Sequence, residues 1–213
     1  MIYHEYKLKA DFICIGERNK GGLYKPTAEI LRYSMLVGAL KKMYGDYPFH
    51  AFGSLLSFEK NYLTYNLRDR YSESAKIPLG IEVLHNVDGK VYITCEDNTI
   101  DLKQNIVLKL GAKLSLGFGE CFLEYLNSKP LDPLKFRVGT LNSRIPIRAQ
   151  SDQELESFLN GKPTQFLKQI FGIKNILKPV YGYLFKPVNQ YTGYYELSLF
   201  ENSKIMGSDF LIN

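Results

Sequence analysis

The sequence predicts an α+β protein, in which a sheet with one covering helix precedes a smaller α+β part. Apolar and polar residues alternate over residues 6–14, with the two-residue period of a half-buried strand. Residues 27–45 repeat apolar side chains at three- and four-residue spacing, which is typical of a helix that packs on a sheet. Short apolar runs bounded by turn residues follow, and these indicate further strands.

The first strand and the helix come before a segment without clear periodicity. The strand ends at Gly16, and the helix begins at Thr27 as its N-cap, spans about five turns and ends at Gly45. Residues 47–80 are aromatic, charged and weakly periodic, so we interpret them as an irregular insertion, with a projecting hairpin as one form it could take. A polar link joins the strand to the helix.

Four strands are expected after the insertion. Residues 80–97 look like two strands joined at Asp88-Gly89, a good hairpin signal. The apolar runs at 104–110 and 121–126 supply the other two. The first 126 residues therefore follow the order β-α-insertion-β-β-β-β, consistent with an elaborated ferredoxin-like (RRM-like) domain.

The second part, residues 127–213, begins at a linker with two prolines. Helical patterns cover 151–161 and 164–172, and strand-like runs cover 180–188 and 193–201. We therefore expect a smaller C-terminal α+β part.

The loop "GAKLSLGFGE" lies between the last two strands of the first part. Three glycines allow positive φ or close approach of another group, and a lysine and a serine add a cation and a hydroxyl. Two interpretations stay open: a loop that binds phosphate, and a glycine-rich turn that binds nothing. The loop residues of interest are Gly111, Lys113, Ser115, Gly117 and Gly119.

Composition limits the class of protein. The 213 residues suit one large domain or two small ones, and 45% apolar residues are enough for a core. No run approaches the ~18 apolar residues of a membrane span and the N-terminus lacks a signal-peptide pattern, so we expect a cytoplasmic protein with no membrane partner. The three cysteines are scattered and without metal-ligand spacing, so we expect buried thiols and no metal. No Walker-type loop or dinucleotide fingerprint appears, so we expect no cofactor.

Charge and aromatic content are compatible with nucleic acid. Lysine and arginine number 27 against 22 acidic residues, a net charge of +5, and 14% of residues are aromatic although tryptophan is absent. Tyrosine and phenylalanine recur inside basic stretches, which suits a surface where bases stack and phosphates pair with cations. A tyrosine-rich sheet protein with no nucleic-acid role is the alternative.

Two motifs in this order resemble the RAMP superfamily of CRISPR-associated RNA-binding proteins. Pro26-Thr27 leads into a helix that carries Gly38-Ala39-Leu40, and the glycine loop precedes an apolar strand. The resemblance covers about the first 125 residues; it departs at Leu116, where the loop usually carries Arg or Lys. It implies that the loop lies against an RNA backbone.

The resemblance also suggests a path for the RNA. Arg18, Lys20 and Lys25 lie in the link before the predicted helix, whose dipole favours an anion there. Arg144 and Arg148, four apart in an extended segment, would share a face and continue this track. A solvated cationic surface is the alternative for each of these residues.

Three functions remain open. About 95 residues follow the glycine loop, which is more similar to the non-catalytic subunit that caps a CRISPR effector complex and holds the 5′ handle of the crRNA. Its partners would be crRNA and the backbone and large subunits of that complex. A metal-independent endoribonuclease that processes repeat RNA is the second possibility, with His50 as the base and Lys60 as the cation. A protein unrelated to RNA is the third.

Overall fold

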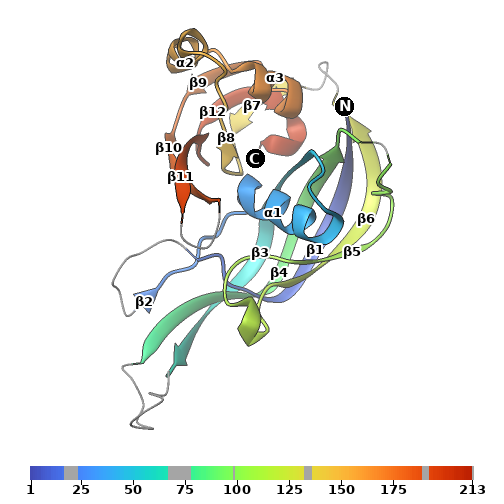
Figure 1. Cartoon of the computed structure of the whole chain (residues 1–213), viewed down its shortest axis with the longest axis vertical. Coiled ribbons are helices and arrows are strands. Elements are labelled where there is room, and N and C mark those ends of the chain that lie inside the picture. Colours follow the sequence, from blue (N-terminus) through green and yellow to red (C-terminus); the bar gives the residue numbers. More distant parts are fainter. Residues whose placement is uncertain (17–23, 67–77, 98, 132–135, 189–191, 213) are drawn as a thin grey trace.

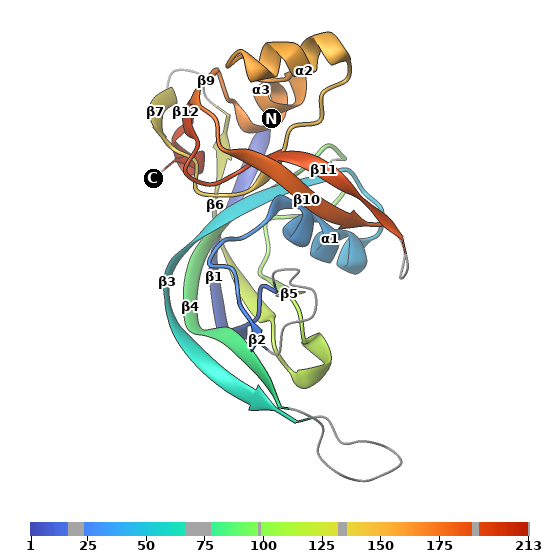
Figure 2. The same ribbon diagram turned by 90° about the vertical axis from the view of Figure 1, so that its left-hand side faces the viewer.

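The structure is a computed structural model that describes residues 1–16, 24–66, 78–97, 99–131, 136–188 and 192–212. It has the mixed α+β arrangement that the sequence predicts. A long, curved sheet runs through the molecule, helix α1 (Tyr33–Tyr44) packs on it, and the C-terminal part sits at the end near the N-terminus (Figures 1 and 2).

The large sheet has the strand order of a ferredoxin-like unit. Across its width the order is β3-β4-β1-β6-β5, with β2 paired in parallel to β4. A ferredoxin-like unit carries its second helix between its third and fourth long strands. Here that interval holds β5 and the 3-10 turn η1 (Leu114–Leu116) instead. The strands are β1 (Ile2–Ile13), β2 (Tyr24–Lys25), β3 (Phe49–Tyr65), β4 (Leu79–Cys95), β5 (Ile106–Lys109) and β6 (Glu120–Pro130).

Helix α1 is shorter than predicted and does not begin at Thr27. It has 12 residues, starts after Arg32 and ends, as expected, at Gly45. Thr27 is buried beside the end of β1, where its hydroxyl accepts a hydrogen bond of 2.8 Å from the Ile15 N–H. That bond holds the link against the sheet, so the chain turns into a helix only later.

The predicted hairpin at Asp88-Gly89 is wrong, because β4 runs through it as one 17-residue strand. Gly89 pairs with Leu8 on one side and Leu55 on the other. A Cβ at Gly89 would lie 2.7 Å from the Ser54 carbonyl oxygen. The glycine therefore permits close approach of a neighbouring strand rather than a turn.

The segment predicted as an irregular insertion is mostly regular strand. β3 has 17 residues and pairs with β4 from Phe49↔Cys95 to Tyr65↔Leu79, with two register shifts. The two strands project together beyond the rest of the sheet (Figure 2), so the projecting hairpin is confirmed and the irregularity is not.

Over its described residues, the C-terminal part contains two short helices and two three-stranded sheets. Ser151 and Thr164 cap the helices as N-cap residues, accepting hydrogen bonds from the N–H groups of Glu154 and Leu167. The sheet orders are β10-β11-β8 and β7-β12-β9. The elements are β7 (Phe136–Thr140), β8 (Ile145–Pro146), α2 (Asp152–Leu159), α3 (Gln165–Phe171), β9 (Asn175–Lys178), β10 (Tyr181–Pro187), β11 (Gly193–Leu199), β12 (Lys204–Ser208) and the 3-10 turn η3 (Asp209–Leu211).

One buried core joins both parts of the chain. Tyr3 and Phe52 of the large sheet pack against Phe210, with ring centroids 5.4 and 5.3 Å apart, and Phe52 also contacts Phe171. The Tyr3 hydroxyl donates to the Ile170 carbonyl. The β10–β11 ribbon passes back over α1 (Figure 2). Residues of both parts of the chain therefore line one groove beside α1.

Two further expectations concern thiols and membranes. Cys14 and Cys121 are buried, as expected, and Cys95 is half-buried; burial raises the pKa of the Cys121 thiol to about 12. Among the helices described, none is long and apolar enough to cross a membrane.

Candidate nucleic-acid interface

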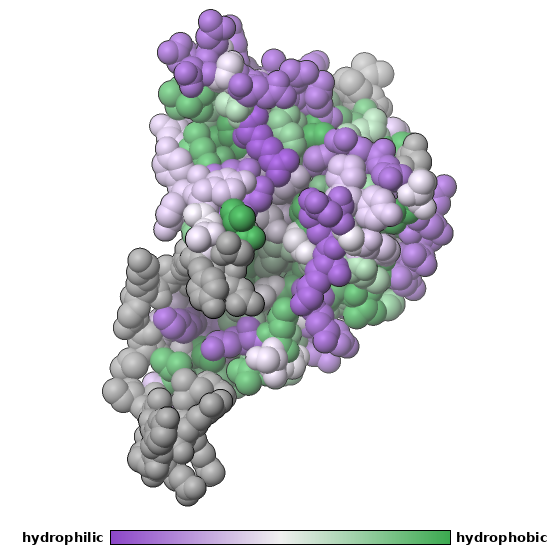
Figure 3. All heavy atoms as spheres, viewed as in Figure 1, coloured by the Kyte–Doolittle hydropathy of each residue, from purple (hydrophilic) through white to green (hydrophobic). Residues whose placement is uncertain are grey.

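A groove of about 440 Å³ lies between α1, the start of the glycine loop and the β10–β11 ribbon. We call it the basic groove, because among the described residues that line it four carry cationic side chains and one, Glu196, carries a carboxylate. The surface is hollowed beside α1, with hydrophilic side chains on both sides (Figure 3). The cations are Arg32, Lys41, Arg148 and Lys186.

Three glycines also line the basic groove, and the fold needs them to different degrees. Gly111 has a φ of 89°, and a Cβ there would lie 2.4 Å from the Cys14 carbonyl oxygen, so the fold requires glycine. A Cβ on Gly16 would make an ordinary contact of 3.5 Å with Ala112. Gly38 lies inside α1, where glycine costs roughly 0.5–1 kcal/mol against alanine, and nothing is within 4 Å of its Cβ position. No neighbouring atom requires glycine at position 38, and the missing side chain leaves the groove wall open there.

Arg148 is held over aromatic rings at the wall of the basic groove. Its guanidinium carbon lies 4.7 Å from the Phe166 ring centroid and 5.4 Å from that of Tyr33. Its Nε donates to Glu196 Oε1 at 3.3 Å. Its own φ is 48°, a left-handed conformation that is uncommon outside glycine. The stacking presents a planar, permanently charged donor group to the groove.

The other cations come from α1 and its N-cap and from β10. Arg32 Nη1 donates to the Gly16 carbonyl at 3.4 Å, next to the link that precedes α1. Lys41 pairs with the exposed Asp46 near the C-terminal end of α1. The Lys186 ammonium of β10 lies 5.4 Å from the ring centroid of Tyr194 on β11.

Tyr33 lines the groove and begins a hydrogen-bond chain through the buried His50 to Glu96. Its hydroxyl lies 2.8 Å from His50 Nδ1, and His50 Nε2 lies 3.0 Å from Glu96 Oε1. Burial raises the pKa of Tyr33 to about 12 and lowers the pKa of His50 below its usual value. Tyr33 is therefore neutral, and its hydrogen bond to His50 holds in place the ring beside which the Arg148 guanidinium lies.

The glycine loop is anchored to the end of β1. Ala112 N–H donates to the Cys14 carbonyl at 2.6 Å, and Gly119 N–H donates to the Phe12 carbonyl at 2.7 Å. Of the predicted loop residues, Gly111 lines the basic groove; Lys113, Ser115 and Gly117 lie at the turn η1, and Gly119 precedes β6.

Gly117 and Gly119 serve different purposes. Both have positive φ, 87° and 82°. A Cβ on Gly119 would lie 2.0 Å from the Leu110 carbonyl oxygen, whereas the Cβ position of Gly117 has nothing within 4 Å. Lys113, with a φ of 61°, precedes the turn in the same left-handed region.

Arg144 and Arg148, the two arginines of the predicted track, have different surroundings in the structure. Arg144 makes two hydrogen bonds of 2.6 Å to the carboxylate of Glu201 and lies over Phe200 at 4.6 Å. Only Arg148 lines the basic groove. The strand between them ends at Pro146, and the left-handed φ of Arg148 breaks the two-residue alternation on which the prediction depended.

The remaining predicted cations stand as follows. Lys25 belongs to β2, which pairs with the start of β4, and does not line the groove. Arg18 and Lys20 lie outside the described residues, two and four positions after Gly16 of the groove.

The nuclease pair His50 and Lys60 is not brought together. Both lie on β3, ten residues apart in an extended strand, which corresponds to about 33 Å. Lys60 pairs with Glu29, which lies in the link before α1, and with Glu82 of β4. His50 is 6% exposed, held between Tyr33 and Glu96. The predicted base and cation therefore cannot act on one phosphate.

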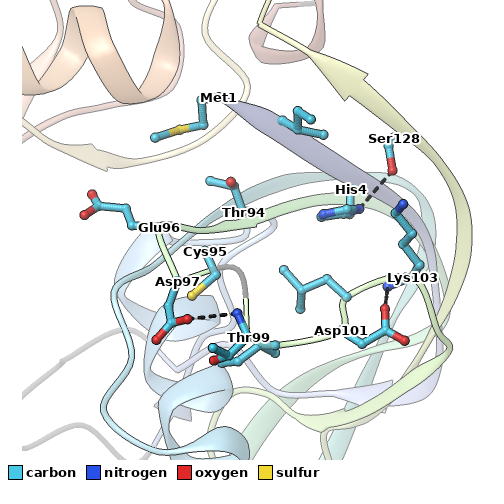
Figure 4. A pocket seen from close by; sticks show the side chains of 13 residues that line it. Met1, His4, Thr94, Cys95, Glu96, Asp97, Thr99, Asp101, Lys103 and Ser128 are labelled. Atoms are coloured by element: carbon cyan, nitrogen blue, oxygen red, sulfur yellow. Dashed lines mark hydrogen bonds between the residues drawn. The ribbon is translucent and has the colours of Figure 1, made fainter.

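A second, larger pocket of about 840 Å³ lies at the other end of the sheet (Figure 4). Glu96, Asp97 and Asp101 line it, with Lys103 as the one lysine. His4 bonds to Ser128 in its wall at 3.0 Å. This acidic balance repels phosphate, so the smaller basic groove is the better candidate for nucleic acid.

Over the described ranges, no group of three or more His, Cys, Asp or Glu could hold a metal ion.

Sequence reasoning missed the contribution of the ribbon. Lys186, Glu196 and Tyr194 are about 75 residues beyond the glycine loop, and no local pattern shows that β10 and β11 fold back over α1. One sequence feature did point to the groove: Gly38 lies inside a predicted helix, although glycine has a low helix propensity.

No protein-family model and no curated protein matches the sequence. Among solved structures, the chain is similar to one in the cryo-EM structure of the Type III-B Cmr-beta bound to cognate target RNA, with a TM-score of 0.59, 9% identity, and coverage of 95% of this chain and 86% of that one. The same complex bound to cognate target RNA and AMPPnP contains a similar chain, with a TM-score of 0.57, 11% identity, and coverage of 97% and 86%.

This likeness concerns the fold. It extends over nearly the whole length of both chains, including the C-terminal part that the sequence motifs do not cover. The chain therefore shares the fold of these chains of the Type III-B Cmr-beta complex.

Proposed function

We propose that this protein is a non-catalytic RNA-binding subunit of a CRISPR effector complex, and that it holds the 5′ handle of the crRNA in the basic groove. The observation that carries the proposal is the convergence of four cations and three glycines on one groove. The shared fold supports the setting, since the similar chains come from an RNA-bound Type III-B complex.

The wall formed by α1 and the glycine loop suits an RNA backbone. Arg32 and Lys41 supply charge, and Ser34 supplies a hydroxyl that can hydrogen-bond phosphate or ribose. Gly16, Gly38 and Gly111 let the sugar-phosphate chain approach the protein backbone closely. Such contacts act on any sequence, so they hold the strand without reading it.

The proposed path can extend beyond the groove at both ends. Arg18 and Lys20 follow Gly16 in the sequence, and Lys113, Ser115 and Gly117 follow Gly111. We propose these as further RNA contacts, with Lys25 at the margin. The backbone and large subunits of the effector complex are the proposed protein partners.

The first experiment separates binding from cleavage. We would incubate the purified protein with labelled repeat-derived RNA in EDTA and analyse it on native and denaturing gels. We expect a shifted band at low salt and intact RNA. Discrete cleavage products would contradict the non-catalytic role, and no shift would contradict RNA binding.

The second experiment tests the place of binding with two neighbouring lysines of α1. Lys41 lines the basic groove, whereas Lys42, also exposed, does not. Lys41→Ala should lower the slope of log affinity against log salt by about one unit, because one counterion fewer is released. Lys42→Ala should leave the slope unchanged. Equal slopes for the two variants would contradict binding in the groove.

A further inference from the structure

The β10–β11 ribbon, which forms the far wall of the basic groove, has one face with exposed tyrosines and another face with charged residues that line the groove. Tyr181, Tyr183 and Tyr195 are 52%, 67% and 64% exposed. Tyr183 and Tyr195 lie on the face opposite Glu196, because residues alternate between faces along a strand. The face that carries Glu196 also carries Lys186, and both line the groove.

Tyr194 belongs to the groove face. It is two residues from Glu196 on β11, and it pairs directly with Lys186 across the ribbon. The Lys186 ammonium lies 5.4 Å from the Tyr194 ring centroid. The ring is nevertheless 47% exposed. An open aromatic surface beside a cation therefore borders the groove.

The two walls of the groove differ in their side chains in a way that orients a strand. Glu196 is the carboxylate of the ribbon wall, and its side chain is 16% exposed. Its charge is balanced by Arg148, whose Nε lies 3.3 Å from Glu196 Oε1, whereas the glycines that admit a sugar-phosphate backbone lie on the α1 side with Arg32 and Lys41. A single strand in the groove therefore has its backbone toward α1 and its bases toward the ribbon.

We infer that Tyr194 is the base-stacking residue of the groove. This rests on the proposed function, and it adds the side on which the bases lie and the residue that holds one of them. Stacking is tolerant of base identity because every base presents a π-face. Tyr194 thus strengthens binding of single-stranded RNA without selecting a sequence.

The test compares two RNAs on the full-length protein by fluorescence anisotropy at low salt. One is a labelled oligouridylate of about ten nucleotides, and the other is an abasic oligomer of the same length. Tyr194→Ala should weaken binding of the oligouridylate by at least about fivefold and leave the abasic oligomer nearly unchanged. Tyr194→Phe keeps the ring and should bind like the wild type.

Tyr183→Ala is the matched control, since it removes an exposed tyrosine from the opposite face of the same ribbon. It should bind both RNAs like the wild type, and thermal melts should show all variants folded. Photocrosslinking with 5-bromouridine should label Tyr194.

The outcomes separate the two proposals. If the wild type binds the oligouridylate but Tyr183→Ala weakens it as much as Tyr194→Ala, the stacking site is wrong while RNA binding stands. Equal losses for oligouridylate and abasic oligomer in Tyr194→Ala would also overturn stacking. If the wild type binds neither RNA, the proposed function itself is overturned.

Discussion

Gly38 shows how a single residue can be placed for a ligand rather than for the fold. It interrupts α1 with the residue least suited to a helix other than proline, yet a Cβ there would meet nothing within 4 Å. Gly38→Ala should raise the free energy of unfolding by about 0.5–1 kcal/mol. Urea denaturation followed by circular dichroism measures this directly. A loss of stability would mean that the helix needs the glycine.

Arg144 and Arg148 differ in how tightly their side chains are held in the fold. Arg144 and Glu201 are 16% and 19% exposed and paired through two bonds, so Arg144→Ala leaves a poorly solvated carboxylate and should cost about 3 kcal/mol of stability. Arg148 is more exposed, so Arg148→Ala should cost about 1 kcal/mol through lost ring contacts, while it weakens RNA binding. Paired denaturation and binding measurements on both variants check this; the reverse order of stability losses would contradict it.

His50 makes stability depend on pH. Burial holds the pKa of His50 in the folded protein below the value of 6.5 expected when unfolded, against the opposing effect of Glu96 and together with Arg148 and Lys41. Below pH 6.5 the unfolded chain therefore binds more protons at this site, and stability falls as pH falls. His50→Gln cannot titrate, so it should show a shallower loss of stability between pH 7.5 and 5.5. His4, whose pKa is also lowered by burial, should leave a residual slope. An unchanged slope would exclude His50 as the source.

At the scale of elements, the glycine loop combines a rigid anchor with an open turn. Gly119 and Gly117 have nearly the same positive φ, so alanine strains both backbones alike, by about 1–2 kcal/mol. Only at Gly119 would the Cβ collide with a carbonyl oxygen, at 2.0 Å. Gly119→Ala should therefore destabilise the protein clearly more than Gly117→Ala. Thermal melts of the two variants test this. Equal decreases in Tm would show that the Leu110 carbonyl does not restrict the side chain at position 119.

The sequence predicted elements where local chemistry decides them. The helical patterns at 151–161 and 164–172 and the alternation of β1 identified real elements, because each depends on neighbours in the chain. Prediction failed at Gly89 and Thr27. There the neighbours are distant in sequence: the Ser54 carbonyl beside Gly89 and the Ile15 N–H at the Thr27 hydroxyl.

The candidate site was half predictable for the same reason. Gly111 and Arg148 were expected and line the basic groove, whereas the ribbon wall required knowing that β10 and β11 fold over α1. The division at residue 126 stays a prediction, although Tyr3 and Phe52 share a core with Phe171 and Phe210 across it. At the scale of the whole molecule, the groove exists because both parts of the chain pack together.

The central claim, that RNA lies in the basic groove against α1, is tested most directly by placing one negative charge inside or outside it. Gly38→Glu adds a carboxylate to the groove wall where space is open, and Met43→Glu adds the same charge on the same helix at a 51% exposed position that does not line the groove. Affinity for single-stranded RNA, measured by anisotropy on variants with confirmed melts, should fall at least about tenfold in Gly38→Glu and less than about twofold in Met43→Glu. Equal losses, or no loss in Gly38→Glu, would contradict the claim.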